Sequence, residues 1–137
     1  MTGILIITHA NLGQALIDAV ELTSDEKIEN IFFVSVDIKD SPEVLRNKIK
    51  KGIKRVQGDK GVIIFTDMFG GTPHNLSCSF LEEGFIEVIS SVNLPMLVKA
   101  IGIREKMDVA KAVKHIVMEG KKSISLASGI LRGEKRE

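Results

Sequence analysis

Two short runs of this chain consist entirely of apolar, mostly branched residues: Ile4 to Ile7 and Val62 to Phe65. Each run is followed within a few residues by a stretch that can form a helix. A strand that is apolar on both faces is typical of a parallel sheet covered by helices on each side, whereas a half-exposed strand alternates apolar and polar residues. The sequence therefore predicts an α/β fold, a three-layer sandwich with a mostly parallel sheet in the middle.

Apolar periodicity and capping residues place the other elements. Strands are expected to end at His9 and to cover residues 31–36, 61–66, 85–90 and 123–126. Helices are expected to begin near residues 12, 42, 73, 94 and 109, the third reaching about Glu83 and the last ending before Gly120. The expected strand order is 2-1-3-4, with Ser123–Leu126 as an edge strand. We expect one domain over residues 1–132 and a charged tail over residues 133–137.

Composition limits the classes of function. A formal net charge of +1 over 137 residues argues against a nucleic-acid binder. No apolar run approaches the length of a bilayer span, and the first basic residue is Lys27, so we expect no secretory signal; a bacterial-type cytoplasm or any other reducing compartment fits. Cys78 is the only cysteine, which excludes an internal disulfide and a multi-cysteine metal site. We expect it to be a buried, small apolar residue.

Two residues suited to chemistry end neighbouring strands of the predicted sheet. His9 ends the first strand and Asp67 follows the third. In the order 2-1-3-4 the chain leaves these two strands in opposite directions, which opens the crevice where such folds bind ligands. Asn11, with Gln14 three residues later, has the form of a capping box, so His9 is also expected beside a helix N-terminus that favours an anion.

An imidazole beside a carboxylate in such a crevice is suited to phosphoryl transfer. If Asp67 accepts a proton from one ring nitrogen of His9, the other nitrogen faces the crevice as a nucleophile. Main-chain N–H groups around Gly70 and Gly71, together with the Thr72 hydroxyl, would bind the phosphoryl oxygens without a metal or another cofactor.

Each of these residues also has a purely structural explanation. Asp67 is suited to start a turn, Gly70 and Gly71 to form one, and Thr72 followed by Pro73 to cap a helix. It is their convergence on one crevice that favours the functional interpretation. His115 is expected to be an exposed, structural residue near a helix C-terminus. His74 is expected to be a neutral residue at the surface or at the pocket rim, with contact to the phosphate as the alternative.

Three segments of the chain resemble a known family. They are Gly3 to His9, Asp67 to Asn75 and Val92 to Leu97, and they resemble the enzyme IIA components of the mannose, fructose and sorbose class of the bacterial sugar phosphotransferase system. The resemblance covers about residues 3–130. Ala10 stands where the family often has glycine, and His74 where it more often has an apolar residue.

The resemblance implies a cytoplasmic phosphocarrier. It implies that His9 takes a phosphoryl group from the histidine-containing phosphocarrier protein and passes it to an enzyme IIB, with Asp67 orienting the ring and Thr72 and its neighbours lining the pocket. It also implies a homodimer in which the segment Ser123–Leu126 is exchanged, and at most an indirect association with the membrane through the permease.

Other functions fit less well or stay open. A receiver domain needs acidic residues after its first strand to hold magnesium, and Thr8 to Asn11 stand there instead. A nucleotide-binding domain would carry a G-x-x-x-x-G-K-(S/T) loop or a G-x-G-x-x-G turn, and this chain has neither. A hydrolase with Asp67 as its nucleophile would need a second acidic residue two positions later, where Phe69 stands. A phosphoryl donor to a dihydroxyacetone kinase, a regulatory phosphorylation sensor and a non-enzymatic ligand-binding module remain as alternatives.

Overall fold

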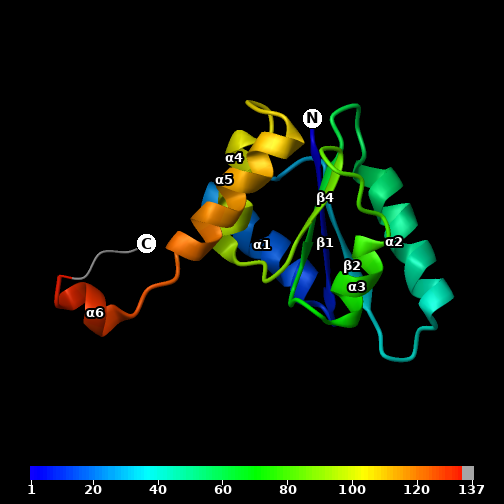
Figure 1. The fold of residues 1–137 in the computed structure, drawn as a ribbon, viewed down its shortest axis with the longest axis horizontal. Coiled ribbons are helices and arrows are strands. Elements are labelled where there is room, and N and C mark those ends of the chain that lie inside the picture. Colours follow the sequence, from blue (N-terminus) through cyan, green and yellow to red (C-terminus); the bar gives the residue numbers. More distant parts are fainter. Residues whose placement is uncertain (134–137) are drawn as a thin grey trace.

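The computed structural model describes residues 1–133, in which strands and helices alternate along most of the chain (Figure 1). Of the predicted charged tail, only Gly133 lies within the described residues. The elements are β1 (Gly3–His9), α1 (Leu12–Ser24), β2 (Ile31–Val36), α2 (Pro42–Val56), β3 (Val62–Thr66), α3 (Thr72–Cys78), β4 (Ile86–Ile89), α4 (Leu94–Ile103), α5 (Val109–Lys122) and α6 (Ala127–Leu131).

The four strands form one parallel sheet in the order β2-β1-β3-β4, which confirms the predicted topology. β1 and β3 are neighbours in the centre, with Ile7 opposite Thr66 at their carboxyl ends. β2 lies on the other side of β1, with Val36 opposite His9. The residues that follow β1, β2 and β3 therefore meet at one edge of the sheet.

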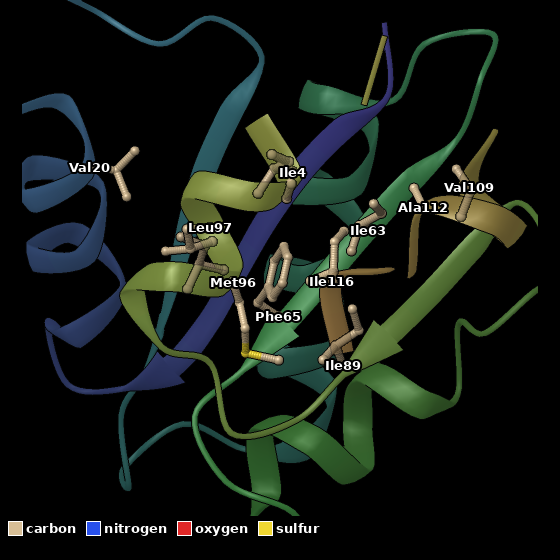
Figure 2. Close-up of a cluster of buried hydrophobic side chains, with 12 residues drawn as sticks. Ile4, Val20, Ile63, Phe65, Ile89, Met96, Leu97, Val109, Ala112 and Ile116 are labelled. Atoms are coloured by element: carbon tan, nitrogen blue, oxygen red, sulfur yellow. The ribbon is translucent and has the colours of Figure 1, made fainter. Parts of the chain in front are cut away.

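Side chains alternate between two cores along the central strands, as the fully apolar runs require. Ile4, Ile6, Ile63 and Phe65 face α1, α4 and α5, where Leu97 and Ile116 are fully buried among them (Figure 2). The intervening residues face α2 and α3 across the sheet and form the second cluster, which includes Leu5, Ile7, Ile49, Val62 and Ile64. The helices thus cover both faces of the sheet (Figure 1).

The predicted edge strand at Ser123–Leu126 is wrong for the single chain. α5 continues through Gly120 to Lys122, because Gly120 packs so closely on Met96 that a side chain there would collide with it. The chain then runs to α6 with no strand pairing, and its alternating apolar residues are exposed: Ile124 by 74% and Leu126 by 71%. α6 stands away from the three layers (Figure 1).

The third helix is also shorter than predicted, because α3 ends at Cys78 and not at Glu83. Before β4 the chain reverses direction in a tight turn, and the residues of this turn cannot also be helical. In it the backbone N–H groups of Glu82 and Ile86 each donate to the carbonyl of the other residue, at 2.9 and 2.8 Å.

A buried arginine anchors the opposite, amino-terminal edge of the sheet. Arg104, at the end of α4, is 3% exposed, and its guanidinium donates to the carbonyl oxygens of Glu29 (2.6 Å), Asn30 (3.2 Å) and Thr2 (3.3 Å). Burial lowers its pKa, and nearby Glu105 and Glu29 oppose this effect. The planar guanidinium ties together the segments that lead into β1 and β2.

Candidate functional site

His9 and Asp67 meet at the carboxyl edge of the sheet. Nδ1 of the His9 ring lies 2.7 Å from Oδ2 of Asp67, although the two residues are 58 positions apart in the sequence. β1 and β3 carry them there as adjacent parallel strands. The predicted juxtaposition of imidazole and carboxylate is therefore present.

The Asp67 carboxylate is held by three donors. Its Oδ2 also accepts the His9 backbone N–H at 2.8 Å, and its Oδ1 accepts the Met68 backbone N–H at 3.0 Å. Burial raises the pKa of Asp67, but the hydrogen bonds from the backbone and ring of His9, and the attraction to that ring when it is protonated, outweigh this effect, so that the pKa lies below its usual value. An ionised carboxylate can only accept hydrogen bonds, so Nδ1 of His9 carries the proton.

The other ring nitrogen of His9 is left for chemistry. The side chain of His9 is 52% exposed, whereas that of Asp67 is 11% exposed. With its proton on Nδ1, the neutral ring presents a lone pair on Nε2. The arrangement is a nucleophile oriented by a largely shielded carboxylate, as the histidine of a catalytic triad is oriented by its aspartate.

The two predicted glycines lie beside this ring in the loop between β3 and α3. Gly70 has a φ of +82°, which favours glycine and turns the chain toward α3. Gly71 packs against the imidazole: a Cβ at this position would lie 3.3 Å from Cε1 of His9. The absence of a side chain at Gly71 therefore lets the backbone approach the ring closely.

Thr72 is close to His9, but it is not the helix cap that the sequence predicts. Gly71 occupies the N-cap position of α3, and no side chain caps this helix. Thr72 is the first helical residue and is exposed, and together with His9 it lines a cavity of about 390 Å³. The hydroxyl thus has no capping role, and Thr72 lines the same cavity as the candidate nucleophile.

The predicted capping box at Asn11 and Gln14 is also wrong. Asn11 makes no side-chain cap, because its backbone is not in the extended conformation of a capping residue. The buried hydroxyl of Thr8 instead accepts the Gly13 backbone N–H at 2.9 Å. Ala10 makes the turn from β1 to α1 with a φ of +50°, a conformation that glycine adopts at lower cost.

Two smaller predictions about the surroundings need correction. His74 is 8% exposed and is neither a surface nor a rim residue, because its ring lies under the loop that follows β3. Cys78 is exposed and not buried, since it lies on the outer side of α3. His115 is exposed on α5, as predicted.

The sequence interpretation did not identify the loop between β2 and α2 as part of this region. Asp37, Ile38 and Asp40 line the same cavity as His9. Asp40 is paired with Lys48 at 2.6 Å, and Ile38 is 98% exposed. The signal was available, because this loop follows the strand that neighbours β1 and must emerge at the same edge of the sheet.

Exposed apolar side chains occur in the segments that lead away from the carboxyl edge of the sheet, where His9 lies. Met68 is 55% exposed and Phe69 is 75% exposed in the loop after Asp67, and Leu12 is 46% exposed at the start of α1. Together with Ile38 they give the His9 region an apolar rim. Such a rim is typical of a surface that another protein covers.

Residues 1–133 contain neither a cluster of metal ligands nor a membrane-spanning helix. No group of three or more His, Cys, Asp or Glu residues is placed to hold a metal ion there. Nor does any helix in that part of the chain have the length and hydropathy needed to cross a bilayer.

Comparisons with known proteins agree on one family. The family model described as PTS system fructose IIA component matches residues 3–117. The fructose-specific EIIA component of Bacillus subtilis is 24% identical over 93% of this chain and 88% of its own length. The sorbose-specific EIIA component of Lacticaseibacillus casei is 29% identical over 83% of this chain and 82% of its own length. The mannose-specific EIIAB component of Escherichia coli is 29% identical over 75% of this chain and 32% of its own length.

Solved structures share the fold. The phosphotransferase system component EIIA from Streptococcus agalactiae superposes with a TM-score of 0.83 at 24% identity, covering 93% of this chain and 98% of the other. The PTS IIA protein associated with the fucose utilization operon of Streptococcus pneumoniae gives a TM-score of 0.83 at 22% identity, with 95% and 96% covered.

Proposed function

This chain belongs to the enzyme IIA family of the mannose class of the bacterial sugar phosphotransferase system, and from that premise we propose that it carries a phosphoryl group on Nε2 of His9. Members of this family are phosphotransferases with a phosphocarrier role in sugar uptake. The hydrogen bond of 2.7 Å between Nδ1 of His9 and the ionised Asp67 is the observation that carries the assignment to this residue.

The incoming phosphoryl group comes, in this proposal, from the histidine-containing phosphocarrier protein. The Nε2 lone pair of His9 attacks the phosphorus, and the phosphorus–nitrogen bond to the donor histidine breaks, with its electron pair returning to the donor imidazole. The His9 ring gains positive charge in this step, and the Asp67 carboxylate stabilises that charge without taking the Nδ1 proton.

The phosphoryl oxygens need donors, which we assign to Gly70, Gly71 and Thr72. Gly71 gives the close approach of backbone to ring, and the exposed Thr72 hydroxyl lies on the same cavity as His9. Backbone N–H groups and a hydroxyl can stabilise a transferring phosphoryl group when they are positioned before the reaction.

The outgoing step reverses the first, with a nucleophilic side chain of an enzyme IIB as the acceptor. Both partners have to reach His9, and the apolar rim of Leu12, Ile38, Met68 and Phe69 offers them a contact surface. We propose that this transfer takes place in the cytoplasm, with any membrane association made indirectly through the permease.

The direct test is phosphorylation with phosphoenolpyruvate and the two general proteins of the system. We expect one acid-labile phosphoryl group per chain, and none in His9→Ala. The matched control is His115→Ala, which removes an exposed histidine on α5 and should be labelled like the unaltered protein. Label that persists in a folded His9→Ala variant and maps to another histidine would reject the assignment.

We further propose that two copies exchange the segment Ser123–Leu126. β4 is an edge strand, and a groove beside it is lined by Val88, Ile89 and Ile124. The exposed Ile124 and Leu126 would be buried if this segment paired with β4 of a second copy. A variant ending at Lys122 should elute as a monomer in light-scattering chromatography, whereas the full chain should be a dimer; a monomeric full chain would reject the exchange.

A further inference from the structure

A second histidine is buried beneath the loop that carries Asp67. His74 lies in the first turn of α3 and is 8% exposed. Its Nδ1 is 2.9 Å from the hydroxyl of Thr66, and its Nε2 is 3.5 Å from the sulfur of Cys78. The ring of Phe69 packs on it, with 5.1 Å between ring centroids and planes tilted by 49°. Both ring nitrogens and one ring face are therefore engaged.

These contacts fall on both sides of Asp67. Thr66 immediately precedes Asp67 as the last residue of β3, and Phe69 follows it by two positions. The next residue of α3 also holds the loop, because Asn75 donates from its side-chain amide to the carbonyl of Gly70 at 3.3 Å. The loop between β3 and α3 is thus fixed from beneath by α3 and from the side by His9.

The polar ring of His74 does what an apolar residue of similar size could not. The Thr66 hydroxyl is fully buried, and the His74 ring is its hydrogen-bond partner. That bond fixes the orientation of the ring, and the ring face in turn supports Phe69, which is otherwise 75% exposed. A leucine in this place would fill the space but leave the hydroxyl unpaired and Phe69 without a fixed surface.

We propose that His74 is a positioning residue for phosphoryl transfer: by holding Thr66 and Phe69, it sets the Asp67 carboxylate at its distance from the His9 ring. The part of this proposal that concerns transfer rests on the function proposed above. The part that concerns the geometry of His9 does not, because the protonation of the ring can be measured without any partner protein.

Loosening this support should act on His9 through Asp67. If the loop shifts by a few tenths of an ångström, the bond between Asp67 and Nδ1 weakens, and part of the population places the proton on Nε2. That nitrogen is then unavailable as the nucleophile. Small misplacements of catalytic groups reduce rates strongly, so we expect kcat to fall on the order of tenfold while KM for the phosphorylated donor stays nearly constant.

The experiment combines two variants of the support with one of the carboxylate. His74→Leu and Thr66→Val each remove the bond between the two side chains, and Thr66→Val does so with almost no change of shape. Nitrogen-15 NMR of the His9 ring reports the fraction with the proton on Nδ1, and transfer kinetics report kcat and KM. We expect both variants to lower this fraction and kcat. His115→Leu, a substitution of an exposed histidine, is the matched control and should change neither.

Coupling to Asp67 separates positioning from general support of the fold. In an Asp67→Asn background, His74→Leu should cause little further loss of kcat, because the contact it supports is already gone. Equal losses in both backgrounds, or lower stability with unchanged His9 signals, would overturn the proposal. If His74→Leu does not fold, Thr66→Val decides. If the unaltered protein accepts no phosphoryl group, the proposed function is rejected. The NMR measurement of the His9 ring then still tests whether His74 positions Asp67.

Discussion

Replacing Asp67 with asparagine tests the central contact of the site, because asparagine has nearly the same shape but cannot satisfy all three donors. The backbone N–H groups of His9 and Met68 point at different oxygens of the carboxylate. An amide has one oxygen, so either the Met68 N–H or the His9 N–H must face an NH₂ group. One unpaired donor costs about 1–3 kcal/mol, which leaves a typical domain folded.

The effect on transfer should be larger than the effect on folding. Two unit charges about 4 Å apart interact by roughly 4 kcal/mol at an effective dielectric constant of about 20. The His9 side chain is 52% exposed, and solvent screening reduces this by about half, to about 2 kcal/mol or roughly 30-fold in rate. If the amide NH₂ faces Nδ1, the ring must also carry its proton on Nε2, so we expect a total loss on the order of 10²-fold.

The assay is a single-turnover transfer from the phosphorylated histidine-containing phosphocarrier protein, quenched at short times, with circular dichroism to establish that the variant is folded. Asp59→Asn is the matched control, because the Asp59 side chain is 87% exposed and precedes β3 at the amino-terminal edge of the sheet, whereas His9 lies at the carboxyl edge. A folded Asp67→Asn variant whose transfer rate stays within about twofold of the unaltered protein would refute the role given to Asp67.

Three further outcomes are expected. Gly71→Ala should stay folded, because the backbone conformation of Gly71 suits alanine, but its methyl group would press on His9 and Met68, and transfer should slow about tenfold in the same assay. The pKa of Asp67 is lower in the folded state than the unfolded value of 3.8, so its stabilising contribution is present above that pH and is lost as the pH falls through the folded pKa. When urea unfolding is measured at decreasing pH, the free energy of unfolding should therefore fall less below about pH 4 for Asp67→Asn than for the unaltered protein. Arg104→Met removes the guanidinium donor of three carbonyl groups, of which that of Asn30 keeps the Ile4 backbone N–H, and should lower the free energy of unfolding by about 2–4 kcal/mol, with transfer by the folded fraction unchanged. An equal stability would show that the buried guanidinium does not stabilise the fold.

The layers and strand order could be predicted because they depend on patterns that extend over many residues. The runs at Ile4–Ile7 and Val62–Phe65 demand burial on both faces, and only a central position in a parallel sheet provides it. The meeting of His9 and Asp67 follows from that order alone, since both residues end adjacent parallel strands.

The predictions that failed depend on contacts that a local pattern does not contain. Asn11 is a residue type that often caps helices, but its side chain makes no cap here, and the Gly13 backbone N–H donates instead to the hydroxyl of Thr8 in β1. Gly120 looks like a helix end and is a packing position against Met96. The alternation of Ser123–Leu126 is real, but a strand needs a partner, and within the single chain this segment pairs with no strand edge.

The burial of His74 could not be predicted for the same reason. A histidine near a helix N-terminus is ordinarily exposed or at a rim, and nothing in its neighbourhood of the sequence identifies the Thr66 hydroxyl and the Phe69 ring as its partners. The role of the loop between β2 and α2 was missed because its residues show no periodicity, and only the assembled sheet places them beside His9.

The anchoring of the amino-terminal edge by Arg104 has a consequence for how such a chain can change. The residues that secure the frame and the residues that surround the reactive histidine occupy opposite ends of the same strands. Exposed side chains beside the site, such as Ile38 and Met68, can then be replaced one at a time, giving related chains different exchange partners, while the part of the fold that keeps them in place is inherited without alteration. Thermal stability and choice of partner become traits that selection can adjust separately.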